Sequence, residues 1–240
     1  MTIGDQIIYE DNHLLVLNKQ GGQITQSDKT GDVCMSDEIR AFLRVRDHKM
    51  GNIFCGVVHR LDRPVSGAVV FAKTSKALGR LNVMIQERRD FEKRYWAIVK
   101  NAPPQQEGHL EDYIYRVPRL NKSFVADKPN ADSKLAILDY RTLAVSDGGY
   151  HLLEIVLHTG RHHQIRCQLA HLGCPIKGDL KYGFPRSNND GNISLHSRQI
   201  ALDHPVRHEW MTFVADPPAE FHQMFGAYID NENKQISIKQ

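Results

Sequence analysis

The sequence predicts an α+β protein, because strand-like segments dominate and a few helical segments are interspersed among them. Residues 134–145 and 149–158 alternate apolar and polar side chains on both sides of a Ser-Asp-Gly-Gly turn, which predicts a hairpin. Residues 75–89 instead repeat apolar side chains at helical spacing. No internal repeat or low-complexity linker divides the 240 residues, so we expect a single domain, with its core at about 7–221 and a frayed tail at about 230–240.

The first strands and the first helix follow from local patterns. Residues 7–17 alternate on both sides of Asp11-Asn12, so two short strands joined at that point are expected. Residues 36–47 place several apolar side chains partly on one face, which favours a helix.

The next segment combines a turn, a helix and a strand. Residues 57–73 contain two apolar runs on either side of a turn, which predicts two strands. The helix over 75–89 follows Thr74 and Ser75, and either hydroxyl can cap its first N–H groups. Residues 93–100 have the composition of a further strand.

The second half of the chain contains the predicted hairpin and less regular segments. Residues 101–133 are polar and contain prolines, so a surface excursion with short strands is expected. After the hairpin, Thr159 is expected to cap a helix that continues through Leu172, with Gly173 just past its end. Residues 184–192 are predicted to be a mobile loop.

The motif His59-Arg60-Leu61-Asp62, followed by Ser66-Gly67, is the most informative part of the sequence. It places one carboxylate between the guanidinium groups of Arg60 and Arg63, and these cations are expected to hold it ionised. A rigidly held, ionised carboxylate can act as a nucleophile or stabilise positive charge. By itself, however, the motif slightly favours a surface turn with an Arg-Asp ion pair.

A second group of motifs changes this interpretation. Residues 159–166, Thr-Gly-Arg-His-His-Gln-Ile-Arg, are followed by Cys-Pro-Ile-Lys-Gly-Asp at 174–179 and by Lys-Tyr-Gly at 181–183. With the aspartate motif, they resemble in order the HRLDxxxSG, TGRxHQIR and GxPIxGDxxYG blocks of the RluA family of RNA pseudouridine synthases. The resemblance extends from about residue 7 to about residue 221, and several long blocks in one order are far more specific than a lone motif.

The resemblance implies the pseudouridine synthase fold, a mixed, mainly antiparallel sheet with flanking helices and a central cleft. It implies an isomerase that converts specific uridines in tRNA or 23S-type rRNA to pseudouridine without a metal or other cofactor. The catalytic pattern begins near residue 7, so the N-terminal accessory RNA-binding domain of many relatives is expected to be absent. We expect a cytoplasmic monomer that binds RNA and no membrane, because the sequence has no apolar signal segment or membrane-spanning run.

The resemblance also implies roles for individual residues. Asp62 is the catalytic carboxylate, which either attacks the nucleotide covalently or helps to remove a ribose proton. Arg166 is expected to pair with Asp62 and orient it. Tyr95 is expected to stack on the flipped uracil or take part in proton transfer. Arg60 is expected to enter the RNA stack as the target base leaves.

Other positions have weaker signals. Ile165 is expected to floor the uracil pocket or simply to fill the core, and His59 to contact substrate or to fix the aspartate turn through the backbone. The net charge is only +3, from 31 basic and 28 acidic residues, so attraction to phosphate requires local clustering of cations. The family usually has Lys-Pro where this chain has Lys19-Gln20, so the loop there lacks the rigidity of proline. The residues expected to track phosphates are Lys19, Lys73, Arg161, Lys177 and Lys181.

Two other functions are alternatives at this point. One is a metal site that uses His158, His162, His163 and His171. The first two have helical i,i+4 spacing, but the Thr-Gly pair between them is expected to break the helix, and no acidic partner completes a known motif. The other is a catalytically silent RNA-binding module, against which the presence of Asp62, Tyr95 and Arg166 argues. The four cysteines form no CxxC pair, so reduced thiols are expected.

Overall fold

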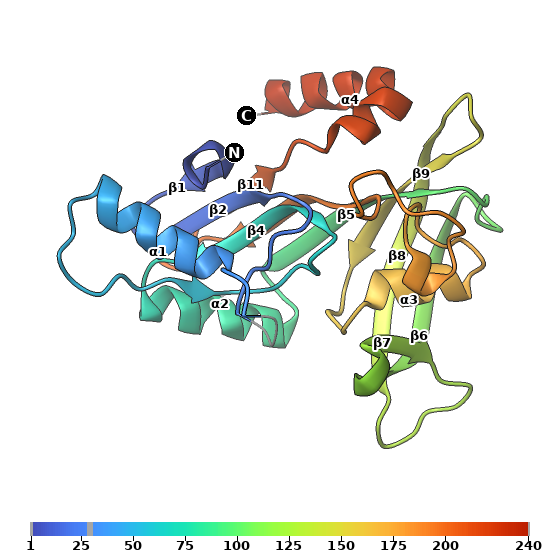
Figure 1. Ribbon diagram of the computed structural model, residues 1–240, viewed down its shortest axis with the longest axis horizontal. Helices are drawn as coiled ribbons and strands as arrows, with labels where there is room; N and C mark the ends of the chain where they lie inside the picture. The colour runs from blue at the N-terminus through green and yellow to red at the C-terminus, as the bar shows by residue number, and fades with distance from the viewer. Residues whose placement is uncertain (1, 28–30, 240) are drawn as a thin grey trace. The chain divides into compact units, whose positions relative to one another are not determined.

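The computed structural model describes residues 2–27 and 31–239, with side chains through residue 236 (Figure 1). The chain forms two compact units. Unit 1 comprises Met1–Lys93 and Ser197–Asp216, and unit 2 comprises Arg94–His196 and Pro217–Gln240. The chain passes from one unit to the other within strand β5, Phe91–Val99, and within strand β10, Leu195–Asp203. A single functional domain, as expected from the sequence, therefore remains a prediction.

Unit 1 is an antiparallel sheet with helices beside it. Its strands follow the order β1-β2-β4-β10, with β3 paired to β4 and β11 paired to β10. The pairs β1·β2, β2·β4, β3·β4 and β10·β11 are antiparallel. The other elements of the unit are η1 Gly4–Gln6, β1 Ile7–Glu10, β2 Leu14–Lys19, α1 Met35–Arg46, β3 Gly56–Val57, β4 Ser66–Ala72, α2 Ser75–Glu87 and β11 Trp210–Val214.

The core of unit 1 explains why these segments form its sheet. Every residue of β4 is buried, and β2 is buried at all positions but one. The two strands pair from Leu14 opposite Ala72 to Lys19 opposite Gly67. Helix α2 adds Ala77 and Leu81 to the same apolar cluster. The strands predicted over 7–17 and 57–73 and the helices predicted over 36–47 and 75–89 are thus confirmed.

Thr74 caps helix α2 as predicted. Its Oγ1 accepts a hydrogen bond from the backbone N–H of Ala77 at 3.2 Å, while Ser75 is the first helical residue. One of the N–H groups that the helix cannot satisfy internally therefore has a partner.

The strands of unit 2 follow the order β5-β9-β8-β6-β7, and the pairs β5·β9, β8·β9, β6·β8 and β6·β7 are antiparallel. Helix α3 lies beside β7 and β6 (Figure 1). The remaining elements are β6 Glu107–Val117, η2 Pro118–Leu120, β7 Lys122–Val125, β8 Lys134–Val145, β9 His151–Leu157, α3 Gln164–His171, η3 Leu180–Tyr182 and α4 Ala219–Lys239. Strands β8 and β9 form the predicted hairpin. Within the described residues, no helix is long and apolar enough to cross a membrane.

Three predictions for unit 2 need correction. The segment 101–133 contains an eleven-residue strand, β6, because both of its edges pair, one with β8 and one with β7. The segment from about 230, expected to be a frayed tail, is helical as part of α4. This helix, which is kinked at Phe225, was not predicted, although its buried Phe221, Phe225 and Ile229 recur every four residues and pack in one cluster with Trp96.

Thr159 does not cap α3, which begins at Gln164 after His163. The Thr159 hydroxyl has other partners. It accepts the backbone N–H of Ile137 at 2.8 Å and donates to Gln164 Oε1 at 2.8 Å. These bonds hold residues 160–163 in a turn, in which His163 has a left-handed backbone with φ 54°. Gly173 does lie just past the end of the helix, as predicted.

Candidate functional site

The Asp62 loop, residues 58–65, connects β3 to β4 in unit 1. Leu61 and Val65 are buried, whereas Asp62 between them is half-buried. The backbone carbonyl of Asp62 accepts the N–H of Val65 at 3.0 Å, which closes a tight turn. Apolar anchors on both sides therefore present the carboxylate at the surface of the unit. The predicted turn between two strands is confirmed.

Lys19 lies beneath this loop and is fully buried. Its Nζ donates to the carbonyl oxygens of Gln20, Arg63 and Val65 at 3.0, 3.1 and 2.6 Å. Burial lowers the pKa of Lys19 to about 7, an effect that the Asp62 carboxylate opposes and the Arg63 guanidinium increases. The ammonium group thus fastens the Asp62 loop, and its burial does not favour the expected contact with an RNA phosphate.

The segment after Lys19 also supports the loop. The N–H of Gly22 donates to the carbonyl oxygen of Arg63 at 2.8 Å. The backbone N–H of Gln20 donates to Gln23 Oε1 at 2.9 Å, a bond that proline at this position would lack. Hydrogen bonding therefore replaces the rigidity of the usual Lys-Pro pair.

Gly67 and His59 fix the two ends of the aspartate motif. Gly67 has φ +113°, and a Cβ atom there would lie 2.3 Å from the backbone oxygen of Ser197 in β10, so only glycine fits. His59 Nε2 accepts the N–H of Val70 at 3.2 Å. Burial, with a smaller contribution from the Lys93 charge, lowers the pKa of His59 to about 3. A neutral His59 thus supports the loop through the backbone, which was one of its two expected roles.

The two arginines around Asp62 differ. Arg60 is exposed, as a side chain that enters an RNA stack has to be. Arg63 forms an ion pair with Asp32, with 2.7 Å between Nη2 and Oδ2. Asp32 therefore neutralises at least part of the positive charge of Arg63.

In unit 2, helix α3 carries Arg166, whose side chain is buried. Its Nε and Nη2 donate to the two carboxylate oxygens of Asp179 at 2.7 and 2.9 Å. Its Cζ lies 5.1 Å from the centroid of the Tyr182 ring. A bidentate pair below and a ring beside it fix the plane of the guanidinium.

The sequence did not assign roles to Asp179 and Tyr182, although both belong to the GxPIxGDxxYG block. Asp179 is buried and holds Arg166. The Tyr182 hydroxyl accepts the N–H of Ser123 at 2.8 Å, which ties η3 to β7. The fixed spacing of Asp and Tyr in that block was the sequence signal that could have predicted these two roles.

Tyr95 and Ile165 are both buried in unit 2, at 5% and 4% exposure. Tyr95 lies in β5 opposite Ile155 of β9, and Ile165 follows the first residue of α3. Burial suits the core role considered for Ile165, and the contacts of both residues with uracil stay a prediction.

Of the expected phosphate contacts in unit 2, only Lys181 is exposed. Its Nζ donates to the backbone oxygen of Asn121 at 3.1 Å. Arg161 is half-buried, and its Nε donates to a β8 carbonyl oxygen at 2.9 Å. Lys177 pairs with Glu220 of α4. The latter two side chains thus stabilise loops of their own unit.

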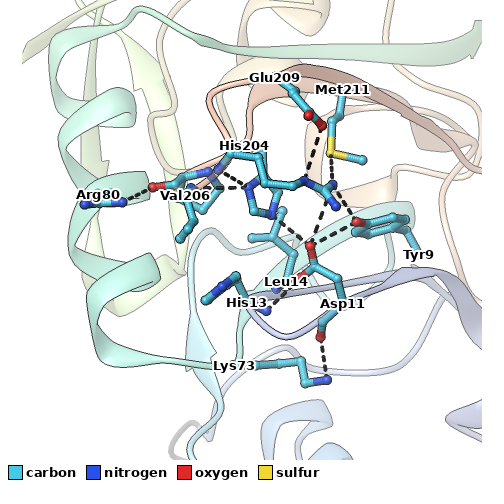
Figure 2. A network of polar contacts seen from close by, with 12 residues as sticks. Tyr9, Asp11, His13, Leu14, Lys73, Arg80, His204, Val206, Glu209 and Met211 are labelled. Carbon is cyan, nitrogen blue, oxygen red and sulfur yellow. Dashed lines mark hydrogen bonds and ion pairs between the residues drawn. The ribbon is translucent and has the colours of Figure 1, made fainter.

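Lys73 closes a polar network in unit 1, shown in Figure 2. Its Nζ donates to Glu10 Oε1 and to the carbonyl oxygen of Asp11, both at 2.6 Å. The Asp11 carboxylate accepts hydrogen bonds from Tyr9 and from the fully buried His204 (Figure 2). Lys73 is 16% exposed, so its internal partners compete with the expected RNA contact.

Three of the four histidines considered for a metal site have separate partners. His158 Nε2 lies 2.6 Å from Asp139, His162 Nδ1 lies 2.9 Å from Ser123 Oγ, and His163 Nδ1 lies 3.1 Å from the Tyr182 hydroxyl. His171 is exposed. No group of three or more His, Cys, Asp or Glu side chains suited to a metal occurs in the part of the chain that the structure describes. A surface hollow over β6, β8 and β9 contains none of the predicted site residues.

Comparisons with known proteins agree with the motifs. The sequence model of the family described as RNA pseudouridylate synthase matches residues 13–171. An uncharacterized RNA pseudouridine synthase of Synechocystis is 32% identical over 91% of this chain and 67% of the relative. The dual-specificity RNA pseudouridine synthase RluA of Haemophilus influenzae is 33% identical over 87% of this chain and 91% of the relative.

Solved structures add evidence about the fold. The protein titled human RNA pseudouridylate synthase domain containing 4 superposes with a TM-score of 0.77, at 23% identity and over 91% of each chain. At this identity the likeness concerns the fold alone, and it confirms the predicted fold.

Proposed function

The chain belongs to the RluA family of RNA pseudouridine synthases, and from this premise we propose that it isomerises specific uridines in tRNA or rRNA through the carboxylate of Asp62. Relatives are named for tRNA and for the ribosomal large subunit, which supports both RNA classes as substrates. The observation that carries the assignment of Asp62 is its loop. A half-buried carboxylate is held there by buried Leu61, Val65 and Lys19.

The reaction breaks the bond between the ribose and a ring nitrogen of uracil, turns the base, and joins the ribose to a ring carbon. That carbon loses its hydrogen as a proton. The Asp62 carboxylate either attacks the nucleotide and is later displaced, or takes a proton from the ribose. Both routes need an ionised carboxylate whose position does not change during the reaction. The braced loop meets this need without a metal or an organic cofactor.

As the family resemblance implies, Arg166 is proposed to orient Asp62. Asp179 already holds Nε and Nη2 of Arg166, so the direction of the guanidinium is set before RNA binds. A pre-oriented cation stabilises the ionised form of the carboxylate at little entropic cost. Tyr95 is proposed to stack on the uracil after it leaves the RNA helix.

Arg60 is proposed to fill the gap that the extruded uridine leaves. Extrusion costs a few kcal/mol of unstacking, and a guanidinium plane can recover part of this cost. The exposed position of Arg60, two residues before Asp62, supports this role.

The test measures tritium release from RNA that carries the label on the reacting ring carbon. Asp62→Asn is expected to abolish release while RNA affinity stays within a few-fold. Asp132→Asn, a carboxylate in an exposed loop of unit 2, is the matched control and is expected to react normally. Full turnover by a folded Asp62→Asn variant would refute the assignment. Binding of RNA without release by the unmodified protein would support the silent RNA-binding module instead.

A second comparison separates extrusion from chemistry. Single-turnover rates are measured on a structured RNA and on one whose target uridine is already unstacked. Arg60→Ala is expected to lower the rate on the structured RNA more than the rate on the unstacked RNA. Asp62→Asn is expected to abolish the reaction of both RNAs equally. The same fractional loss on both RNAs for Arg60→Ala would make this residue a support of the loop.

A further inference from the structure

Two cations from separate segments of unit 2 contact Asn121, at the end of the β6–β7 hairpin, and a third, Lys122, follows it in sequence. Arg116 Nη2 donates to Asn121 Oδ1, and Lys181 Nζ donates to the Asn121 carbonyl oxygen, both at 3.1 Å. Lys122 Nζ lies 4.8 Å from the centroid of the Tyr182 ring. Arg116, Asn121, Lys122 and Lys181 form what we call the Asn121 cluster.

The positive charges of this cluster lie apart from the described carboxylates. Among the described side chains, none of Arg116, Lys122 and Lys181 has a carboxylate oxygen within 4.0 Å. Other cations of the unit are paired, for example Arg141 with Glu154 at 2.8 Å. The partners inside the cluster are neutral oxygens and aromatic rings, so the positive charges are not neutralised. Like charges gathered in this way favour an anion.

The positive charge of the cluster also acts on a buried histidine of unit 2, His163. Burial, together with smaller contributions from the charges of Arg166, His162, Lys181 and Arg116, lowers the pKa of His163 to about 2. Two members of the cluster thus contribute, together with Arg166, to a positive potential at a buried ring.

The cluster is also adjacent to the proposed catalytic arginine. The Tyr182 ring has Lys122 Nζ at 4.8 Å and Arg166 Cζ at 5.1 Å from its centroid. The Tyr182 hydroxyl is bonded to the backbone of β7. An anion held by the cluster therefore lies close to Arg166, the residue proposed to orient Asp62.

The neighbouring side chains favour a nucleotide over a free ion. Leu120 and Leu180, next in sequence to Asn121 and Lys181, are 50% and 57% exposed. A ligand that presents phosphate together with the less polar faces of sugar and base contacts both kinds of side chain. RNA has this composition along its entire length.

We propose that the Asn121 cluster binds a backbone phosphate of the RNA outside the target nucleotide. The proposal deepens the proposed function and rests on it. Phosphate contacts fix register and add affinity without specifying sequence. The cluster is therefore expected to act on RNA binding and not on the isomerisation step.

The test is a salt titration of binding to unfractionated bacterial tRNA, with fluorescence anisotropy as the readout. Removing one phosphate contact reduces the slope of log Kd against log salt by about 1. Lys181→Gln is expected to show this change and to weaken binding severalfold at physiological salt. Lys181→Arg keeps the charge and is expected to keep the slope.

Lys100→Gln is the matched control. Lys100 is also exposed, also donates to a backbone oxygen, that of Gly148, and also lies beside a ring, that of Tyr150. Lys100 lies beside the β8–β9 turn, at one end of β8. The other end of β8 pairs with Ile114 of the β6–β7 hairpin. The two ends of this strand are on the order of 35 Å apart, so Lys100 is far from the cluster. Its replacement is expected to leave the slope unchanged.

An unchanged slope for folded Lys181→Gln and Arg116→Gln would overturn the proposal, as would an equal change for Lys100→Gln. Thermal unfolding of each variant verifies the fold. Asp62→Asn is expected to bind tRNA with the normal slope, so a failure of the catalytic assignment and a failure of the cluster are distinguishable. In single turnover, Lys181→Gln is expected to raise the protein concentration needed for half-maximal rate and to leave the maximal rate unchanged.

Discussion

Replacing Asp11 by asparagine tests how strongly one carboxylate stabilises unit 1 (Figure 2). Asp11 Oδ1 accepts the backbone N–H groups of His13 and Leu14, each at 2.7 Å. Its Oδ2 accepts the Tyr9 hydroxyl at 2.9 Å and His204 Nε2 at 2.8 Å. These bonds connect the β1–β2 turn to the segment after β10, so the network joins parts of the chain that are distant in sequence.

All four groups around the carboxylate are donors. His204 Nδ1 accepts the backbone N–H groups of Val206 and Arg207, at 3.2 and 2.9 Å, so its ring proton must lie on Nε2. An asparagine at position 11 has only one acceptor oxygen. In either orientation its NH2 group faces donors, and two hydrogen bonds are lost.

The pKa shift of Asp11 gives the size of the free energy with which its carboxylate stabilises the fold. Burial raises this pKa, but hydrogen bonds from His13, Leu14, Tyr9 and His204 lower it more, from 3.8 to about 2. At 1.36 kcal/mol per pKa unit, the shift corresponds to roughly 2 kcal/mol of stability. Because the pKa is lower in the folded state, this stability is fully present above about pH 4. It is lost as the pH falls from about 4 through about 2.

The free energy of unfolding is measured by urea titration of the unmodified protein and of Asp11→Asn, at about pH 7 and about pH 2.5. Asp11→Asn is expected to be less stable by at least roughly 2 kcal/mol at the higher pH, and the difference is expected to shrink at the lower pH. A difference that is equal at both values would refute the reasoning, because the carboxylate charge would then contribute nothing. Asp132→Asn, in an exposed loop, controls for the loss of a charge.

The remaining predictions concern the site and its scaffold. Asp179→Asn loosens Arg166 and is expected to lower the single-turnover rate on the order of 100-fold with little change in RNA affinity, and equal losses in both would contradict a positioning role. Gly67→Ala forces a Cβ atom against the β10 backbone and is expected to unfold unit 1 or cost several kcal/mol by urea titration, whereas Gly79→Ala, in an open position of α2, is expected to add up to about 1 kcal/mol. Thr74→Ala removes the α2 cap and is expected to cost about 1 kcal/mol by the same measurement, and no loss would show that water replaces the cap.

Local patterns in the sequence were sufficient for the elements that carry Asp62. The apolar runs before and after the motif predicted two strands and a turn, and Thr74 predicted the start of the next helix. These signals lie within about ten residues of one another, so the chain encodes them without reference to distant contacts. The family resemblance implied that Asp62 is the reacting group, which stays a prediction, and the comparisons confirmed the family.

The predictions for Thr159 and for the C-terminal segment failed because they depend on contacts with distant parts of the chain. Thr159 has the residue type of a helix cap, but its hydroxyl is bonded to Ile137 on β8, and α3 begins later. Helix α4 was missed because its apolar stripe has meaning only once Trp96 of β5 is there to pack on it.

Contiguous motifs and short-range periodicity were enough to predict the family, the aspartate loop and most of the strands. The burial of individual charged side chains depends instead on the tertiary fold. It placed Lys19 under the Asp62 loop and Arg166 on Asp179, and it left three cations unpaired by any described carboxylate around Asn121. A lysine has the same sequence signature in each setting, since burial depends on which distant backbone oxygens and carboxylates the fold brings to it.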